Sequence, residues 1–236
     1  VGQRFESSRA RQLTMKNFLI ISFFFIFIHS LQASENFYDL FMSGQKKEAI
    51  DTLNKLVLSG NQDAEYIMGI LYNDASSLKL CAIKDFCVSE NESNYDKAYQ
   101  IFLNLYTNKN DPRAAYAIGE YYDNHWVFWP NFKKAFKYYL FAAERGVPEA
   151  QYNVANMYEL GDGVKRDLVQ SVRWYLQCNI SSLCGAGEEG IDDLIEQLSK
   201  EEFEYAKSLI NYEIKEVDIR ITAARLVVAV SYTHLT

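Results

Sequence analysis

The feature that most constrains this chain is an internal repeat in which two patterns recur together. Ala114 and Ala150 begin matching segments 36 residues apart, and Ala135 and Ser171 occupy matching places with the same separation. Two patterns that agree on one period indicate a repeated unit with two elements. The first elements are "AEYIMGILY" from Ala64, "AAYAIGEYY" from Ala114 and "AQYNVANMY" from Ala150, and the second are "YDKAYQIFLNLY" from Tyr95, "FKKAFKYYLFAA" from Phe132 and "LVQSVRWYLQC" from Leu168.

Each repeat is expected to be a helical hairpin, because apolar residues recur at helical spacing within both elements. Small residues are expected where the two helices of a hairpin approach closely, at Gly69, Gly119 and Ala155. Stacked hairpins form a solenoid in which each repeat contacts its neighbours. The predicted fold is therefore an all-α, right-handed α/α solenoid over residues 34–216.

Both ends of the chain depart from the repeat. Met15-Lys-Asn precedes the apolar run "FLIISFFFIFI" and a small residue at Ala33, an order typical of a secretory signal peptide at residues 15–33. Residues 1–14 then precede the natural start, and an uncleaved membrane anchor is the alternative. At the other end, Ser199-Lys-Glu-Glu202 is a capping box that opens a capping helix. Residues 217–236 lie outside the period and are interpreted as a disordered or non-native tail, with a short strand as the alternative.

The net charge of the chain limits the kinds of partner that it is expected to bind. The chain has a net charge of −7, and removing residues 1–33 takes away four basic residues and one acidic residue, so the mature chain reaches −7 − 3 = −10. Nucleic acid is therefore a poor candidate partner, and no membrane association is expected after signal cleavage.

The third repeat resembles a Sel1-like repeat, a relative of the tetratricopeptide repeat. "AQYNVANMYELGDGVKRDLVQSVRWYLQ" matches that pattern at Gly161, Gly163, Val164, Asp167, Trp174 and Tyr175. The resemblance extends over about residues 34–212, with Ala155 in place of the helix glycine and no loop glycines in the second repeat. It implies a binding scaffold, without a cofactor, whose first helices line the inner side.

Four cysteines form two pairs of equal spacing, Cys81 with Cys87 and Cys178 with Cys184. Four cysteines permit three pairings, and the two local ones would each close a loop. A zinc site built from all four thiolates is the alternative, although zinc pairs usually have two to four intervening residues. Cysteine-rich secreted Sel1-like proteins join neighbouring helices by disulfides, and two local disulfides are predicted here. They also favour export to the periplasm or beyond the cell.

Catalytic chemistry has little support. Only three histidines are present, and His125 is the one that lies within the repeats. Ser43…Lys46 and Ser76…Lys79 match S-x-x-K, a motif of penicillin-recognising enzymes, but the accompanying motifs are absent. We expect no enzyme and no metal site, and keep a β-lactamase or cell-wall enzyme as the alternative.

A protein or peptide is the expected partner, held on the inner face of the solenoid; the oligomeric state is left open. By the resemblance, the inward residues step i, i+4, i+7 along each first helix. They are Tyr66, Ile70 and Asn73, then Tyr116, Glu120 and Asp123, then Tyr152, Asn156 and Glu159. The alternative for the three tyrosines is packing between helices.

The loop "YYDNHWVFWPN" offers a second candidate surface. Its alignment with "YELGDGVKRD" places Phe128 at the apolar position of Val164 and Asn131 at the N-cap position of Asp167. His125, Trp126 and Trp129 fall at or beside polar positions and are predicted to form an exposed contact site. Packing of the tryptophans on the Cys81/Cys87 insert is one alternative, and carbohydrate or cell-wall binding is another.

Overall fold

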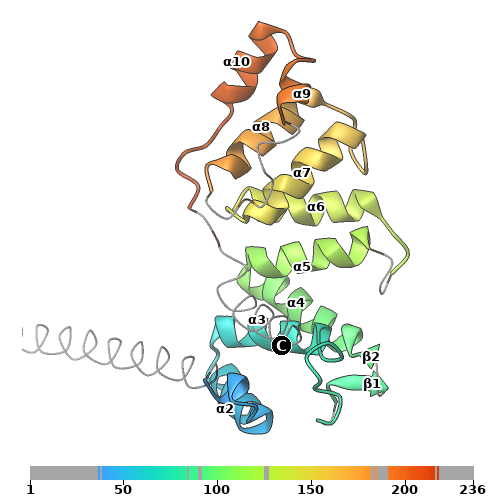
Figure 1. The fold of residues 1–236 in the computed structure, drawn as a ribbon, viewed down its shortest axis with the longest axis vertical. Helices are drawn as coiled ribbons and strands as arrows, with labels where there is room; N and C mark the ends of the chain where they lie inside the picture. The colour runs from blue at the N-terminus through green and yellow to red at the C-terminus, as the bar shows by residue number, and fades with distance from the viewer. Residues whose placement is uncertain are drawn as a thin grey trace, which may run out of the picture. The chain divides into compact units, whose positions relative to one another are not determined.

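The computed structural model describes residues 37, 39–83, 85–89, 92–124, 128–181, 184, 191–215 and 217. The predicted signal peptide at 15–33 lies outside these residues, as does the predicted tail at 217–236 apart from Val217. The elements, shown in Figure 1, are α2 (Lys46–Leu58), α3 (Gln62–Asn73), β1 (Cys87–Ser89), β2 (Glu92–Ser93), α4 (Tyr95–Lys109), α5 (Pro112–Asp123), α6 (Phe132–Ala143), α7 (Pro148–Leu160), α8 (Leu168–Asn179), α9 (Ile191–Ile195) and α10 (Lys200–Ser208). No helix among the described residues is long and apolar enough to cross a membrane.

The chain divides into two compact units, residues 1–65 and residues 66–236. In the first unit, α2 buries Ala49, Ile50 and Leu53 on one face. The rings of Phe37 and Phe41 lie 5.8 Å apart in the same unit. This amphipathic helix corresponds to the second helix of a repeat that precedes Ala64.

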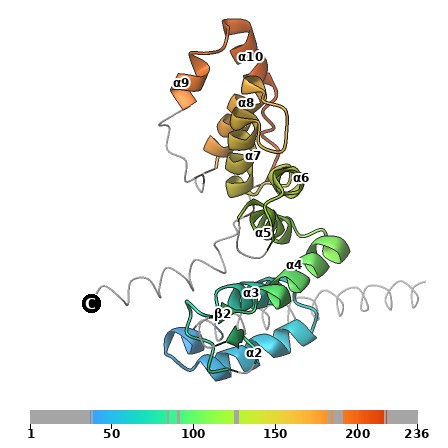
Figure 2. The same ribbon diagram turned by 90° about the vertical axis from the view of Figure 1, so that its right-hand side faces the viewer.

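The second unit is a stack of helical hairpins, as predicted. Consecutive helices from α4 to α8 pack on one another, and α9 and α10 pack on α8 (Figures 1 and 2). Trp174 and Tyr139 are the largest fully buried side chains in a core that α5, α6, α7 and α8 share. A separate cluster of Val172, Leu194 and Ala206 attaches the cap to α8. The all-α solenoid is thereby confirmed.

Side-chain caps explain where most of these helices begin. Asn131 accepts a hydrogen bond from the Lys134 amide at the start of α6, and Asp167 accepts one from the Gln170 amide at the start of α8. The helices α5 and α7 begin at prolines, which lack the amide hydrogen that a first-turn residue would leave unbonded. The predicted capping box at Ser199 is present and opens α10.

Two glycines allow the helices of a hairpin to approach. A Cβ atom at Gly69 would lie 2.5 Å from the Phe102 ring, and a Cβ atom at Gly119 would lie 2.5 Å from the Tyr139 ring. Both rings belong to the second helix of the same repeat and are buried. In the third repeat Ala155 replaces the glycine, and the equivalent Tyr175 ring is only half-buried.

The connection between α3 and α4 is longer than those between α5 and α6 or α7 and α8, and this insert of the first repeat is packed. Its disulfide joins Cys81 and Cys87, whose Cα atoms are 5.0 Å apart. Tyr72 stacks on Phe86 with ring centroids 4.4 Å apart, and the Ser76 amide donates to the Ser93 hydroxyl. The antiparallel pair β1 and β2 lies here and was absent from the sequence-based prediction.

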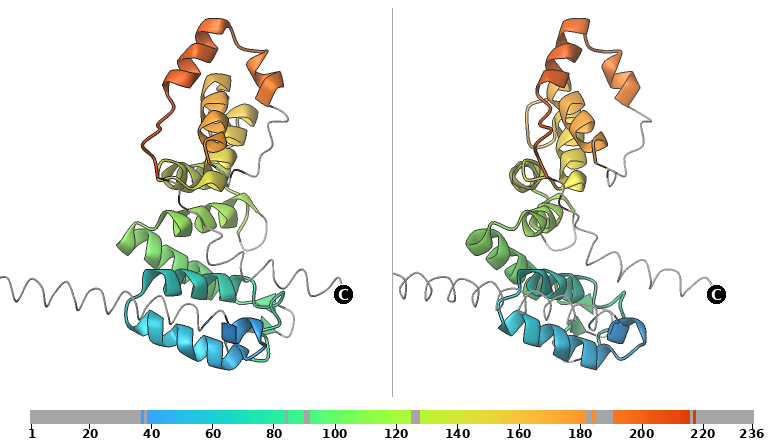
Figure 3. Two further views of the ribbon diagram at one scale, coloured as in Figure 1. Left: turned by 60° about the vertical axis from the view of Figure 1, so that its left-hand side comes forward. Right: turned by 90° about the vertical axis from the view of Figure 1, so that its left-hand side faces the viewer.

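A segment that we call the C-terminal strap, residues 209–215 and 217, returns from α10 along the stack (Figure 3). The Gln177 amide group pairs with the main chain of Asn211, donating to its carbonyl oxygen at 3.0 Å and accepting from its amide at 2.8 Å. Arg173 donates to the Leu209 carbonyl oxygen, and the Val217 amide donates to the Gly146 carbonyl oxygen at 2.7 Å. The strap thus reaches the turn between α6 and α7.

Candidate functional site

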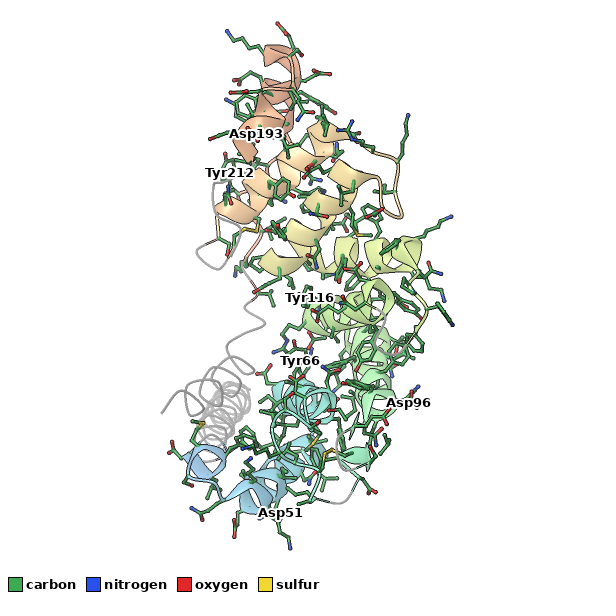
Figure 4. All side chains as sticks on the ribbon, turned by 45° about the vertical axis from the view of Figure 1, so that its right-hand side comes forward. Asp51, Tyr66, Asp96, Tyr116, Asp193 and Tyr212 are labelled. Atoms are coloured by element: carbon green, nitrogen blue, oxygen red, sulfur yellow. A yellow bond between two sulfur atoms is a disulfide. The ribbon has the colours of Figure 1, made fainter. Side chains whose placement is uncertain are left out.

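The predicted inward residues lie on α3, α5 and α7. We call the surface that these residues form the first-helix face. Its members differ in exposure. Tyr66 is buried, Tyr116 is half-buried and Tyr152 has 38% of its surface exposed. Figure 4 shows Tyr66 and Tyr116 at successive levels of the stack.

Each of these tyrosines packs on an aromatic ring of the second helix in its own hairpin. The ring centroids are 5.7 Å apart for Tyr66 and Phe102 and 5.6 Å apart for Tyr116 and Tyr139. They are 5.5 Å apart for Tyr152 and Tyr175. The prediction of a binding role is therefore wrong for Tyr66, because its ring is enclosed.

A second regularity links the third residue of each triplet to a tyrosine hydroxyl. Tyr139 donates to Asp123 at 3.2 Å, and Tyr175 donates to Glu159 at 3.1 Å. Both donors lie 16 residues after their acceptors. These carboxylates therefore help to hold their own hairpins together.

In the first repeat, the third residue of the triplet accepts its tyrosine hydrogen bond from a different helix. Phe102 takes the place of Tyr139 and has no hydroxyl. Asn73 instead accepts a hydrogen bond of 2.6 Å from Tyr121 of the next repeat. Sequence reasoning did not find these links, although the recurring tyrosine and acid at one spacing would have indicated them.

Glu120 stands at the centre of the first-helix face. It is half-buried and accepts a hydrogen bond of 3.2 Å from the Tyr116 hydroxyl. The pKa of Glu120 is raised to about 7, mainly by burial and also by the nearby Asp74, Asp123 and Glu149, against the lowering effect of the Tyr116 hydrogen bond.

The other carboxylates of this face share that environment. Burial also raises the pKa values of Asp74 and Asp123. Within the described part of the chain, no lysine or arginine forms an ion pair with Asp74, Glu120, Asp123 or Glu159. These four carboxylates therefore have no ion-pair partner in that part of the chain, while the Arg113 guanidinium lies over the Tyr66 ring of the same face and pairs with Asp111.

The loop between α5 and α6 combines packed and exposed residues. Phe128 packs in stacked contact on Tyr122 and edge-on against Tyr99, with ring centroids 5.3 and 5.0 Å apart. Its predicted packing role is confirmed, as is the N-cap role of Asn131. Trp129 has 90% of its surface exposed, so it is not folded onto the insert. His125 and Trp126 lie outside the described residues, and their contact role stays a prediction.

The cysteines form the two local disulfides that were predicted, and the zinc alternative is wrong. Cys178 and Cys184 are joined, with Cα atoms 5.4 Å apart, in addition to Cys81 and Cys87. Among the residues that the structure describes, no cluster of three histidine, cysteine or acidic side chains has the arrangement of a metal site. Two disulfides indicate an oxidising compartment.

The S-x-x-K serines have ordinary structural contacts. Ser43 donates its hydroxyl hydrogen to the Leu40 carbonyl oxygen, and the Lys79 amide donates to the Ser76 carbonyl oxygen within a turn. These contacts close local turns.

Sequence comparison identifies the repeat itself. Residues 112–147 and 148–177 match the Sel1 repeat, in agreement with the second and third repeats above. No curated protein has a significantly similar sequence.

Two solved structures have a similar fold. The first is a Sel1 repeat protein from Oxalobacter formigenes, with a TM-score of 0.50 and 19% identity over 62% of this chain and 55% of that one. The second is a protective antigen of uropathogenic Escherichia coli that displays an SLR fold, with a TM-score of 0.51 and 21% identity over 73% of this chain and 43% of that one. The present chain thus spans about half the length of these proteins.

Proposed function

Because this chain is a Sel1-like repeat protein, we propose that it is an exported scaffold that binds a protein or peptide partner. The partner contacts the first-helix face and the loop that carries Trp129. Stacked-hairpin repeats present extended surfaces of the kind used for protein interaction. The acidic first-helix face is the observation that carries this proposal.

The chemistry of that face favours a partner segment with lysine or arginine. Glu120, Asp123 and Glu159 already accept tyrosine hydroxyl hydrogens, so each carboxylate is held in one orientation. A cation placed among them would reduce their mutual repulsion and form charge-assisted hydrogen bonds. Tyr152 supplies an exposed ring beside them for apolar or cation–π contact.

The test starts from selection of a random-peptide library displayed on phage against the purified full chain. We expect enriched peptides with an excess of lysine and arginine. Their affinity is expected to rise by up to about tenfold between pH 6 and pH 8, because Glu120, whose pKa is about 7, ionises over that interval and only the anion attracts a cation.

The triple substitution E120Q/D123N/E159Q is the matched variant, since each amide oxygen still accepts its tyrosine hydrogen bond. Calorimetric titration should show binding weakened at least tenfold and no longer dependent on pH. Basic peptides that bind this variant as tightly as the natural chain would contradict the assignment of the face.

Export is tested separately. The two disulfides support an oxidising destination, and the predicted signal peptide supplies the route. Amino-terminal sequencing of the protein recovered from the periplasm or the medium should begin at Ser34. Recovery of a reduced chain from the cytoplasm only would contradict export.

A further inference from the structure

Two loops meet beside the beginning of α6. Gly163, in the loop between α7 and α8, lies so close to the Phe132 carbonyl group that it has no room for a Cβ atom. The loop that carries Trp129 ends at the same place, since Asn131 caps α6. Side chains from two successive repeats therefore share one edge of the second unit.

This edge presents both aromatic and basic side chains to solvent. Trp129 is 90% exposed and Phe132 is 42% exposed, which are high values for large apolar side chains. Lys133, Lys165 and Arg166 are exposed beside them. We call these five residues the basic–aromatic rim.

The cations of the rim form no ion pairs with the described carboxylates. The sequence from 124 to 143 contains three lysines and no acidic residue, although the whole chain has a net charge of −7. Over the described ranges, no carboxylate forms an ion pair with Lys133, Lys165 or Arg166. The second loop contains two acidic residues: Asp167 is engaged as the N-cap of α8, and Asp162 stands next to Gly163.

We infer that the basic–aromatic rim binds an acidic segment of a protein partner, with an apolar side chain of that segment against Trp129 and Phe132. This inference rests on the proposed function, because it assumes a protein or peptide partner, and it adds the chemistry of the segment. Arg166 donates from Nε to the Glu159 carbonyl oxygen at 2.9 Å, but it and the two lysines keep their charge without an ion pair among the described residues. An exposed tryptophan next to such cations provides apolar contact area and charge complementarity at one place. The rim thus binds an acidic segment, whereas the first-helix face binds a basic one.

The same phage-displayed random library tests the inference. Enriched peptides should include a second class, in which aspartate or glutamate stands next to leucine, phenylalanine or tryptophan. W129A and, separately, K133E/K165E should each weaken this class at least tenfold, whereas K200E/K215E, which changes the net charge equally outside the rim, should leave it within twofold. Raising the salt concentration from 50 to 300 mM should weaken binding several-fold.

Each other outcome overturns the inference. Peptides without an acidic excess, or acidic peptides that bind the rim variants normally, would contradict it. If all enriched peptides respond only to E120Q/D123N/E159Q, the rim fails while the proposed function stands, and if none is enriched both fail. Binding to phosphatidylglycerol-containing vesicles that depends on Trp129, with no acidic peptide class, would identify a membrane surface as the occupant instead.

Discussion

Replacing Trp174 with alanine is expected to lower the free energy of unfolding by about 3–5 kcal/mol. Trp174 is 1% exposed in the core that α5, α6, α7 and α8 share, so truncation removes apolar contacts and leaves a cavity. Thermal unfolding monitored by circular dichroism should show the loss as a melting temperature lower by roughly 10 °C, at about 2–4 °C per kcal/mol for a chain of this size.

Trp129→Ala is the control for this substitution. The same atoms are removed from a side chain that is 90% exposed, and the free energy of unfolding should change by no more than about 0.5 kcal/mol. Equal destabilisation by the two substitutions would show that Trp129 belongs to a core and would remove it from the rim.

Gly163→Ala is expected to cost about 3 kcal/mol or more. Its φ angle of +70° is unfavourable for alanine, and the new methyl group would meet the Phe132 main chain, which cannot rotate away. Chemical denaturation of the purified variant, with the slope compared to that of the natural chain, measures the change.

Gly161→Ala is the matched comparison in the same loop. Its φ angle is +83°, but the nearest atom to an added Cβ is 3.4 Å away, at Arg166. Only the conformational cost of about 1 kcal/mol then applies. The difference between the two variants isolates the contact between successive repeats, and identical losses would mean that no such contact exists.

The helices could be predicted because their causes recur in the sequence. Asn131 and Asp167 are N-caps at equivalent positions, and Gly69 and Gly119 adjoin equivalent rings. Because the unit is repeated, N-cap residues and small residues occur at equivalent positions more than once. The pattern of helices can therefore be recognised above chance. The short pair β1 and β2 occurs once, within an insert, and had no second copy for comparison.

Exposure of the predicted binding residues could not be predicted, because it depends on the neighbouring repeat. Tyr66 and Tyr152 occupy equivalent positions and pack on equivalent rings. The guanidinium of Arg113, held by Asp111 at 2.7 Å, covers Tyr66 at 4.7 Å from α5, the first helix of the following repeat. Tyr152 lies in the last full repeat and is 38% exposed. A residue's own repeat therefore determines its orientation, and the next repeat determines its burial.

The C-terminal strap gives the second unit a particular order of assembly. Contacts between successive helices join residues close in sequence, and such contacts form quickly. The hydrogen bond between Gly146 and Val217 instead joins residues that are separated in sequence by about half the length of the unit. In addition, Gln177 must be fixed in α8 before it can pair with Asn211. The strap is thus synthesised after α8 and docks only once α8 has formed. A force that pulls on the carboxyl end would detach it first, and the hairpins beneath would unfold only after that release.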